Sequence, residues 1–339
     1  MPAAKRTASK ARLHHALVTG GVGFMGSHLT KELVRRGLEV TVLDNLSSGP
    51  RADSIRILAS KGRVTLVRGD CTSSRDVSKA LQGVDTVFHL AANPEVRLEL
   101  NDMENCFRQN VLATHVVLQC ASGTSVKDFV FSSSSTVYGE PKVLPTPEDY
   151  GPLLPISAYG ASKLASEALV SSHCSSLGMN GVILRIANVV GPGSTHGVVY
   201  DLAKKLRANP HELELLGDGT QSKSYLFIDD CIDGLMAAVT RSGPGVSLYN
   251  LGGSDQVQVS EIARIVVQKS GLQNVQVKYT GGVDGGRGWM GDVKTMLLDA
   301  TKITKLGWSP KLNSRQAVER MAESLFRGAS VPSKRNRGQ

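Results

Sequence analysis

Short runs of apolar residues, separated by longer helical stretches, make up the first half of the chain. The runs are apolar throughout instead of alternating with polar residues, which is typical of parallel strands buried on both faces. This succession of strand and helix predicts an α/β fold with a Rossmann-type doubly wound parallel sheet. The predicted strands are 16–19, 40–43, 64–67, 86–90, 129–131 and 181–186, and helical patterns at 27–36, 103–120 and 159–176 lie between them.

The rhythm of the sequence changes after about residue 188, where loops rich in glycine and proline alternate with shorter helical patterns. The segment 225–239 predicts one further strand and helix that return to the first layer. We therefore expect two parts that are interleaved along the chain. The larger domain is 13–187 plus about 224–252, and the smaller C-terminal lobe is 188–223 plus 253–326.

The net charge of +9 is concentrated at the two ends of the chain. Segments 1–12 and 327–339 contain lysine and arginine but no aspartate or glutamate, so the body between them is close to neutral. Basic polar ends of this kind are typical of disordered tails. We therefore expect no nucleic-acid partner, in spite of the overall charge.

The cysteine spacing and the length of the apolar runs argue against a metal site and against a membrane span. Cys71, Cys106, Cys120, Cys174 and Cys231 lack the spacing of metal ligands, so we expect reduced thiols and no metal. The apolar runs are far shorter than the roughly 18 residues of a membrane span. No apolar segment follows the basic start, as it would in a secretory signal. The sequence therefore predicts a cytoplasmic protein with no membrane partner.

A glycine-rich turn follows the first predicted strand directly and leads into a helix. Gly20, Gly23 and Gly26 allow a tight turn, a close approach of the backbone to a pyrophosphate, and close packing of helix on strand. The N–H groups that open the helix, around Phe24 and Met25, then face the phosphates. The pattern predicts a dinucleotide-binding site.

The next predicted strand ends at Asp44. A carboxylate at this position accepts hydrogen bonds from an adenosine ribose hydroxyl and repels a 2′-phosphate, so the sequence favours NAD over NADP. Asp70, after the third strand, is placed to meet the adenine amino group. The small residues after the fourth strand allow a flat ligand to lie on the backbone. The expected cofactor contacts near these strand ends are Asn45, Asp70, Cys71, Leu90, Ala91 and Ala92.

A pair of residues suited to proton transfer lies in the helical stretch after residue 158. The spacing of four places Tyr159 and Lys163 on one helix face, where an ammonium group favours the phenolate form of the tyrosine. Ser134 belongs to a serine run after the fifth strand, and its hydroxyl is a candidate to pass a proton to Tyr159. The alternative is that the run is only a polar loop.

Taken together, these motifs resemble the extended short-chain dehydrogenase/reductase superfamily of nucleotide-sugar enzymes. The resemblance covers roughly residues 14–326 and includes the glycine turn, the strand-end aspartate, the sequence SSSSTVYG and the YxxxK pair, in this order. The later segments RIANVVGP, LGDGTQ and GDV match further landmarks. Within the superfamily the chain is most similar to archaeal-type UDP-glucose 4-epimerases.

The resemblance implies roles for individual residues. It implies Ser134, Tyr159 and Lys163 as the catalytic set, with Tyr159 and Lys163 also touching NAD. Lys223 stands where many members have arginine, which gives a point charge in place of a bidentate fork. The spacing between Arg287 and the GDV segment also varies among branches. The implied contacts to the nicotinamide are Asn110 and Ala187, and those to the nucleotide sugar are Ser134, Tyr159, Asn188, Lys223 and Arg287.

The resemblance implies epimerisation of a UDP-sugar at C4, with transient transfer of hydride to NAD and rotation of the keto-sugar. UDP-glucuronate and UDP-N-acetylhexosamine epimerases remain alternatives. A 4,6-dehydratase is disfavoured because that branch has Asp-Glu after the catalytic hydroxyl residue, where this chain has Ser135 and Thr136. A non-enzymatic NAD-binding regulator has no need of Ser134, Tyr159 and Lys163 together.

Two further expectations concern sugar selectivity and assembly. Hexose-restricted relatives have a bulky tyrosine where this chain has Met296, a flexible side chain that would admit N-acetylated sugars; the alternative is that Met296 only fills the core. The helices near 103–120 and 156–176 resemble those that form family homodimers. The alternative there is that their apolar residues only face the sheet, and those residues are Val111, Leu112, Val116, Leu118, Leu164, Ala168 and Leu169.

Overall fold

The structure, a computed structural model, describes residues 13–47, 52–97 and 102–327. Its centre is a seven-stranded sheet in which every neighbouring pair is parallel, in the order β11-β6-β5-β4-β1-β2-β3. The Rossmann-type fold predicted from the apolar runs is confirmed. The strands are β1 His15–Thr19, β2 Glu39–Asp44, β3 Val64–Arg68, β4 Thr86–His89, β5 Asp128–Ser134, β6 Asn180–Ile186 and β11 Val246–Leu251.

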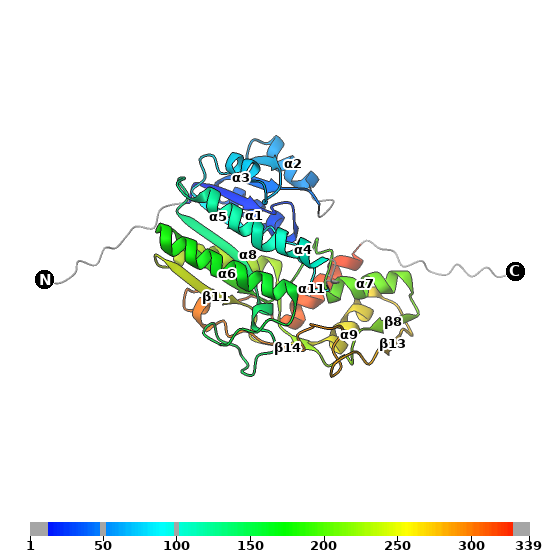
Figure 1. The fold of residues 1–339 in the computed structure, drawn as a ribbon. Helices are drawn as coiled ribbons and strands as arrows, with labels where there is room; N and C mark the ends of the chain where they lie inside the picture. Colours follow the sequence, from blue (N-terminus) through cyan, green and yellow to red (C-terminus); the bar gives the residue numbers. More distant parts are fainter. Residues whose placement is uncertain (1–12, 48–51, 98–101, 328–339) are drawn as a thin grey trace.

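Helices cover both faces of this sheet (Figure 1). On one face α1 (Phe24–Arg35) and α8 (Ile228–Arg241) share a large apolar core with the strands. On the other face a second core joins the sheet to α3 (Ser74–Ala80), α5 (Ala113–Ala121) and α6 (Ala158–Leu177). The alternation of strand and helix implied helices between the second, third and fourth strands, but gave no bounds for α2 (Ala52–Ser60) or α3, because each is short.

Outside the main sheet, the C-terminal half of the described chain forms three small sheets and the helices between them. The predicted strand at 225–239 differs from expectation, because β10 pairs with β7 in a small sheet while α8 alone returns to pack on α1. The strand that does join the main sheet is β11, which we did not predict. The remaining elements of this half are β7 Asn188–Val190, α7 Val198–Ala208, β8 Glu212–Leu215, β9 Ser222–Lys223, β10 Tyr225–Phe227, β12 Val257–Gln258, α9 Val259–Ser270, β13 Gln276–Tyr279, β14 Thr295–Met296, α10 Thr301–Thr304 and α11 Ser314–Phe326.

The predicted helix at 103–120 is interrupted by a π-helical turn. It begins as α4 (Met103–Cys106), widens into η2 (Phe107–Leu112), and continues as α5. Such turns are rare inside helices and gather at functional sites. The expected division into two domains stays a prediction, and the predicted tails lie outside the described residues, except Arg327 at the end of α11. In the described part of the chain, no helix is both long and apolar enough to cross a membrane.

A buried ion pair joins three elements, α6, β5 and β6, near the carboxyl edge of the sheet. Glu167 on α6 accepts hydrogen bonds from Arg185 on β6, with the shortest N–O distance 2.8 Å, and both side chains are almost completely buried. Ser133 on β5 donates its hydroxyl hydrogen to the same carboxylate. The Arg185 guanidinium also donates to the Glu148 carbonyl and lies over the Tyr138 ring. The ion pair therefore fixes α6 against β5 and β6.

Removing one member of this pair should destabilise the protein strongly. In Glu167→Ala the Arg185 charge stays buried without its carboxylate, so we expect a loss of about 3–5 kcal/mol in the free energy of unfolding. Urea denaturation followed by circular dichroism measures it. The matched control is Glu212→Ala, which breaks the exposed Lys278–Glu212 pair (2.5 Å) and should cost less than about 1 kcal/mol. Equal losses in the two variants would contradict the role given to the pair.

Candidate active site

The glycine turn brings the end of β1 against the segment that follows β4. Gly20 has a φ of +66°, and a Cβ atom there would lie 2.9 Å from the backbone N and Cα of Ala91. A Cβ on Gly26 would lie 2.1 Å from the Gly20 carbonyl oxygen. No side chain caps the N-terminus of α1 at Gly23, and no acidic residue lies in its first turn. The helix therefore directs its positive end toward the turn, as a pyrophosphate site requires.

Asp44 ends β2 beside this turn and is nearly buried. Its carboxylate accepts hydrogen bonds from the backbone N–H groups of Val22 (2.9 Å) and Leu46 (2.8 Å). Each oxygen has two lone pairs and uses one of them here, so the carboxylate is held in place and keeps acceptor capacity. This geometry fits a ribose hydroxyl.

The other residues expected around the adenosine lie on neighbouring strand ends. Asp70 receives the backbone N–H and the hydroxyl of Thr72, both at 2.8 Å. Asn45 is exposed, and its amide nitrogen lies 3.4 Å from the Asp70 carboxylate. Cys71 is buried, and burial raises the pKa of its thiol to about 12. Cys71 is therefore a neutral wall of the site, and the two polar residues are the ones able to contact a base.

Ser134, Tyr159 and Lys163 come together from β5 and α6. The Ser134 hydroxyl accepts the Thr136 hydroxyl at 2.9 Å, and Ser134 lies close enough to the Tyr159 phenol to oppose the rise of its pKa. Lys163 is buried; its ammonium group donates to the Ser132 carbonyl at 2.9 Å and lies 5.7 Å from the Tyr159 ring centroid. Helix α6 starts one residue before Tyr159 because Ser157 caps it, accepting the Gly160 N–H.

The electrostatics of this set differ from the sequence-based expectation. We expected Lys163 to lower the pKa of Tyr159, but burial raises that pKa to about 12, and the group that opposes the rise is Ser134. Burial also lowers the pKa of Lys163 to about 8. The physical reason is that desolvation of the phenol outweighs an ammonium group that does not touch it.

Asn110 lies in the π-helical turn and is buried between the two layers. Its amide nitrogen donates to the Ser162 hydroxyl on α6 at 2.9 Å, and its side-chain oxygen accepts the Asn93 N–H at 2.7 Å. Asn110 therefore connects α6 to the segment after β4. Ala187 closes the same region, with its N–H bound to Leu251 of β11 at 2.9 Å.

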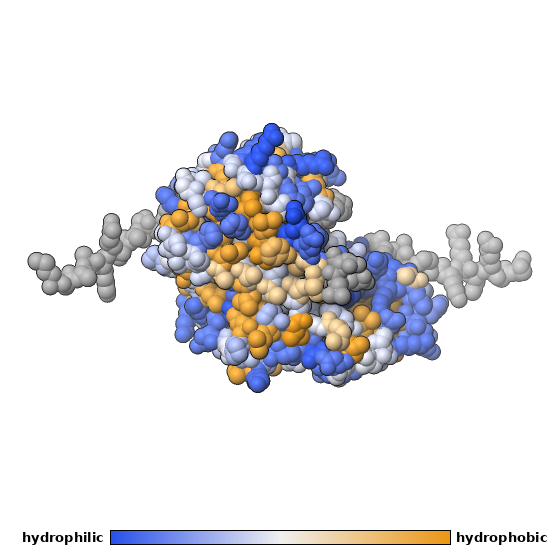
Figure 2. Space-filling model, viewed as in Figure 1, coloured by the Kyte–Doolittle hydropathy of each residue, from blue (hydrophilic) through white to orange (hydrophobic). Residues whose placement is uncertain are grey.

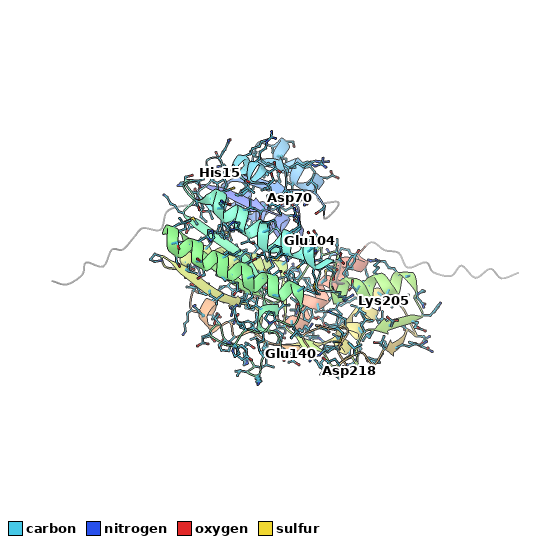
Figure 3. The ribbon with its side chains drawn as sticks, in the orientation of Figure 1. His15, Asp70, Glu104, Glu140, Lys205 and Asp218 are labelled. Carbon is cyan, nitrogen blue, oxygen red and sulfur yellow. The ribbon has the colours of Figure 1, made fainter. Side chains whose placement is uncertain are left out.

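The residues expected at the nucleotide sugar lie in the C-terminal lobe, and the structure shows what holds each. Lys223 pairs with the buried Asp292 at 2.6 Å, and Asn188 donates to the Ser224 carbonyl at 3.2 Å. Arg287 pairs with Glu140 and with Asp284. Figure 3 shows Glu140 in the lower half of the molecule and Asp70 among the N-terminal elements above. These contacts hold the expected substrate residues in place.

Met296 is buried on β14, in a small apolar cluster with Val137 and Ala187. Its backbone is paired with Lys223 of β9. The burial agrees with the core-filling alternative, and the position beside Ala187 is where a selectivity residue would have to be. Both readings of Met296 therefore stay open to experiment.

Sequence reasoning missed several polar residues that organise the site. Thr19, His89 and Thr114 are fully or nearly fully buried and hydrogen-bonded to one another. The signal that was available for Thr19 and His89 is a polar residue that ends an apolar strand; Thr114, on α5, gave none. Arg97 and Trp289 were also missed. The Arg97 guanidinium lies 4.2 Å from the Trp289 ring centroid and joins the segment after β4 to a loop of the C-terminal lobe.

The residues present fit NAD. A Cβ at Gly20 or Gly26 would collide with backbone, so the turn is as tight as a pyrophosphate-binding turn requires; the N-terminus of α1 lacks an acidic residue, and Asp44 is held with spare acceptor capacity. Among the described residues there is no group of three or more side chains able to hold a metal ion.

A sequence profile of the NAD-dependent epimerase/dehydratase family matches residues 16–252. The chain belongs to this family. A crystallised UDP-galactose 4-epimerase is 41% identical with a TM-score of 0.81 and covers 92% of this chain and 99% of its own. UDP-glucuronic acid 4-epimerase from Bacillus cereus, in complex with UDP-glucuronic acid and NAD, is 30% identical with a TM-score of 0.83 over the same shares. UDP-glucose 4-epimerase of Lactobacillus helveticus is 32% identical over 87% of this chain and 92% of its own.

Membership of the family confirms NAD as the cofactor and the superfamily predicted from the motifs. The chain is therefore an enzyme of the NAD-dependent epimerase/dehydratase family. Its relatives act on several nucleotide sugars at similar identity, so the family alone leaves the sugar open.

Tyr159→Phe should abolish turnover without unfolding the protein. The variant loses the hydroxyl that Ser134 contacts and keeps the ring on α6, so we expect normal folding, retention of NAD, and a loss of several orders of magnitude in kcat. The measurements are turnover of the nucleotide sugar that the wild-type enzyme converts fastest and the NAD content of the purified protein. Near-native turnover would remove Tyr159 from the mechanism.

Proposed function

We propose that this enzyme interconverts UDP-glucose and UDP-galactose by epimerisation at C4. The observation that carries the proposal is the meeting of Ser134, Tyr159 and buried Lys163 at the carboxyl edge of a sheet that also carries the tight glycine turn. The similarity to a UDP-galactose 4-epimerase at 41% identity supports it.

The proton moves through residues of this chain. Tyr159 takes the proton of the sugar C4 hydroxyl, while Ser134, beside the phenol, donates its hydroxyl hydrogen to the same sugar oxygen. Lys163, anchored on the Ser132 carbonyl, has two remaining N–H groups for ribose hydroxyls. When bound, NAD⁺ supplies the hydride acceptor and a positive ring that favours the phenolate of Tyr159. The keto-sugar would turn about its diphosphate so that hydride could return from the cofactor to the opposite face of C4, and Tyr159 would return the proton to the C4 oxygen.

The charges at the substrate side favour a neutral sugar. A sugar carboxylate needs a cation to pair with, because an unpaired charge is costly to desolvate. Lys223 is matched by Asp292, and Arg287 by Glu140 and Asp284. A uronate would have to compete with these carboxylates as well as with the diphosphate, so we favour the hexose over UDP-glucuronate.

The two positions after Ser134 hold no acid or base that could catalyse dehydration. The two residues after Ser134 are Ser135, which is buried, and Thr136, whose hydroxyl donates to Ser134. Neither titrates near neutral pH, and elimination of water across C5–C6 needs groups that do.

A panel of UDP-sugars tests the proposed function. Wild-type protein with NAD should interconvert UDP-glucose and UDP-galactose fastest, with slower conversion of UDP-GlcNAc and UDP-GalNAc and the least with UDP-glucuronate. Separation of the epimers by chromatography gives kcat/KM for each sugar. A kcat/KM highest for UDP-glucuronate, or a 4-keto-6-deoxy product, would overturn the proposal.

Met296→Tyr, measured on the same panel, tests the selectivity of the site. If Met296 shapes the pocket around the sugar C2 substituent, the tyrosine should suppress the N-acetylated pair selectively by roughly 10–200-fold. Equal loss on both pairs of sugars would show that Met296 only fills the cluster around Val137 and Ala187.

We propose further that the enzyme is a homodimer held by α5 and α6. Val116 and Leu118 are buried and face the sheet, as the alternative predicted. Val111, Leu112, Leu164 and Leu169 are partly exposed and Ala168 is exposed. Figure 2 shows apolar residues gathered on the face over these helices, and the exposed residues that add to it at α4 and η2 are Met103 and Phe107. Sedimentation at micromolar concentration should give the mass of a dimer. The mass of a monomer would show that the apolar residues of these helices only pack against the sheet.

A further inference from the structure

His89 is a buried titratable residue to which the proposed chemistry gives no role. It ends β4 immediately before the segment that approaches the glycine turn, and none of its surface is exposed. Its ring lies 5.9 Å, between centroids, from both Phe129 and Phe131 of β5. A polar ring in such surroundings is costly unless both nitrogens are hydrogen-bonded.

The helix side of the ring fixes which nitrogen carries the proton. The Thr114 hydroxyl lies 2.6 Å from the Asn110 backbone carbonyl, which can only accept, so the single hydroxyl hydrogen is used there. Thr114 must therefore accept at its contact with His89 Nε2, at 3.0 Å. Nε2 is protonated, an assignment that follows from the hydrogen-bond network.

The strand side gives the same answer independently. The Thr19 hydroxyl oxygen accepts the backbone N–H groups of Leu90 and Ala91, both at 3.2 Å, which occupy its two lone pairs. Its hydrogen is then left for His89 Nδ1, at 2.8 Å. Nδ1 is an acceptor, so the ring is neutral with its proton on Nε2.

This chain of hydrogen bonds continues to the catalytic helix. Asn110, whose carbonyl receives the Thr114 hydroxyl, donates its side-chain amide to the Ser162 hydroxyl at 2.9 Å; the Ser166 hydroxyl is shared between the carbonyls of Ser162 (2.9 Å) and Asn110 (3.2 Å). Ser162 in turn donates to the Tyr159 carbonyl at 2.8 Å. Both serines lie on α6, on either side of Lys163 along the chain.

We propose that His89 is a positioning residue. Its neutral imidazole, held in one tautomer, connects the end of β1 next to the glycine turn with the π-helical turn that holds α6 in place. One end of the coupling is Thr19, next to Gly20, and the other is Asn110. The inference deepens the proposed epimerase function and rests on it for its kinetic effect, but not for the state of the ring.

The surroundings keep the ring neutral. Burial holds the pKa of His89 at about 3, and the nearby ammonium group of Lys163 acts in the same direction. A charged ring would also have to donate from Nδ1 to Thr19, whose lone pairs are already used. The coupling therefore keeps its geometry throughout the neutral pH range.

Three threonine variants separate positioning from packing. Thr114→Val keeps the shape of the side chain and removes both hydrogen bonds, so α6 should shift relative to the cofactor turn; we expect kcat to fall by roughly 10–100-fold with KM changed by less than about threefold. Thr114→Ser keeps the hydroxyl and should hold kcat within about threefold of wild type. The matched control is Thr30→Val, because Thr30 is a fully buried threonine whose hydroxyl has no hydrogen-bond partner among the described residues.

The outcome of the kinetic comparison is decisive in either direction. A kcat for Thr114→Val equal to that of Thr30→Val would overturn the positioning role, and so would equal losses in the valine and serine variants, which would point to packing alone. The NAD content of the purified variants gives a readout that does not depend on turnover, and we expect it to stay at the wild-type level.

Nitrogen NMR of protein labelled in its histidines tests the ring itself. The His89 signals, assigned by their loss in His89→Phe, should show the neutral form protonated on Nε2 and should not change between pH 6 and pH 8, roughly the range around the ordinary histidine pKa. Protonation on Nδ1, or a titration in that range, would overturn the proposal. Inactivity of the wild-type protein on every UDP-sugar would contradict the proposed function and would leave this NMR result as an independent test of His89.

Discussion

The site depends on a single ion pair that lies beneath it, between Glu167 and Arg185. Three of the elements that carry chemistry, β5, β6 and α6, begin or end at the same edge of the sheet, and nothing in a sheet alone fixes how a helix slides over its strands. The pair resists such sliding because any displacement would leave a charge buried without its partner. Ser133 adds the strand of the serine run to the same carboxylate. The placement of Ser134 and Tyr159 relative to one another therefore rests on an interaction that neither residue makes.

Much of the fold and of the chemical site was predictable from the sequence. The apolar runs predicted six strands of the main sheet, because a strand buried on both faces has no polar alternation to obscure it. The residues of the glycine turn, Asp44, Ser134, Tyr159 and Lys163 all lie at the expected edge. β11 escaped prediction because its first half is only partly buried and its sequence alternates. The bounds of α2 and α3 escaped prediction because each is too short to show a clear period.

The energetics of the site could not be predicted from residue types. A lysine four residues after a tyrosine suggests a lowered phenol pKa, yet the ammonium group is held by the Ser132 carbonyl and the phenol is desolvated. The substrate side shows the same limit. Lys223 and Arg287 are recognisable as cations in the sequence, but their partners Asp292 and Glu140 come from other segments, and only the folded chain brings them together.

The packing of Gly26 against Gly20 has a consequence for how this chain can change over time. A methyl group at Gly26 would overlap the Gly20 carbonyl, and the obstacle is backbone, which no neighbouring rotamer can relieve. Such a position tolerates almost no drift, whatever sugar the enzyme handles. Met296 and Lys223 lie among side chains, which can be exchanged in compensating pairs. During divergence, the glycine turn should therefore stay recognisable in the sequence long after the residues that select the sugar have changed.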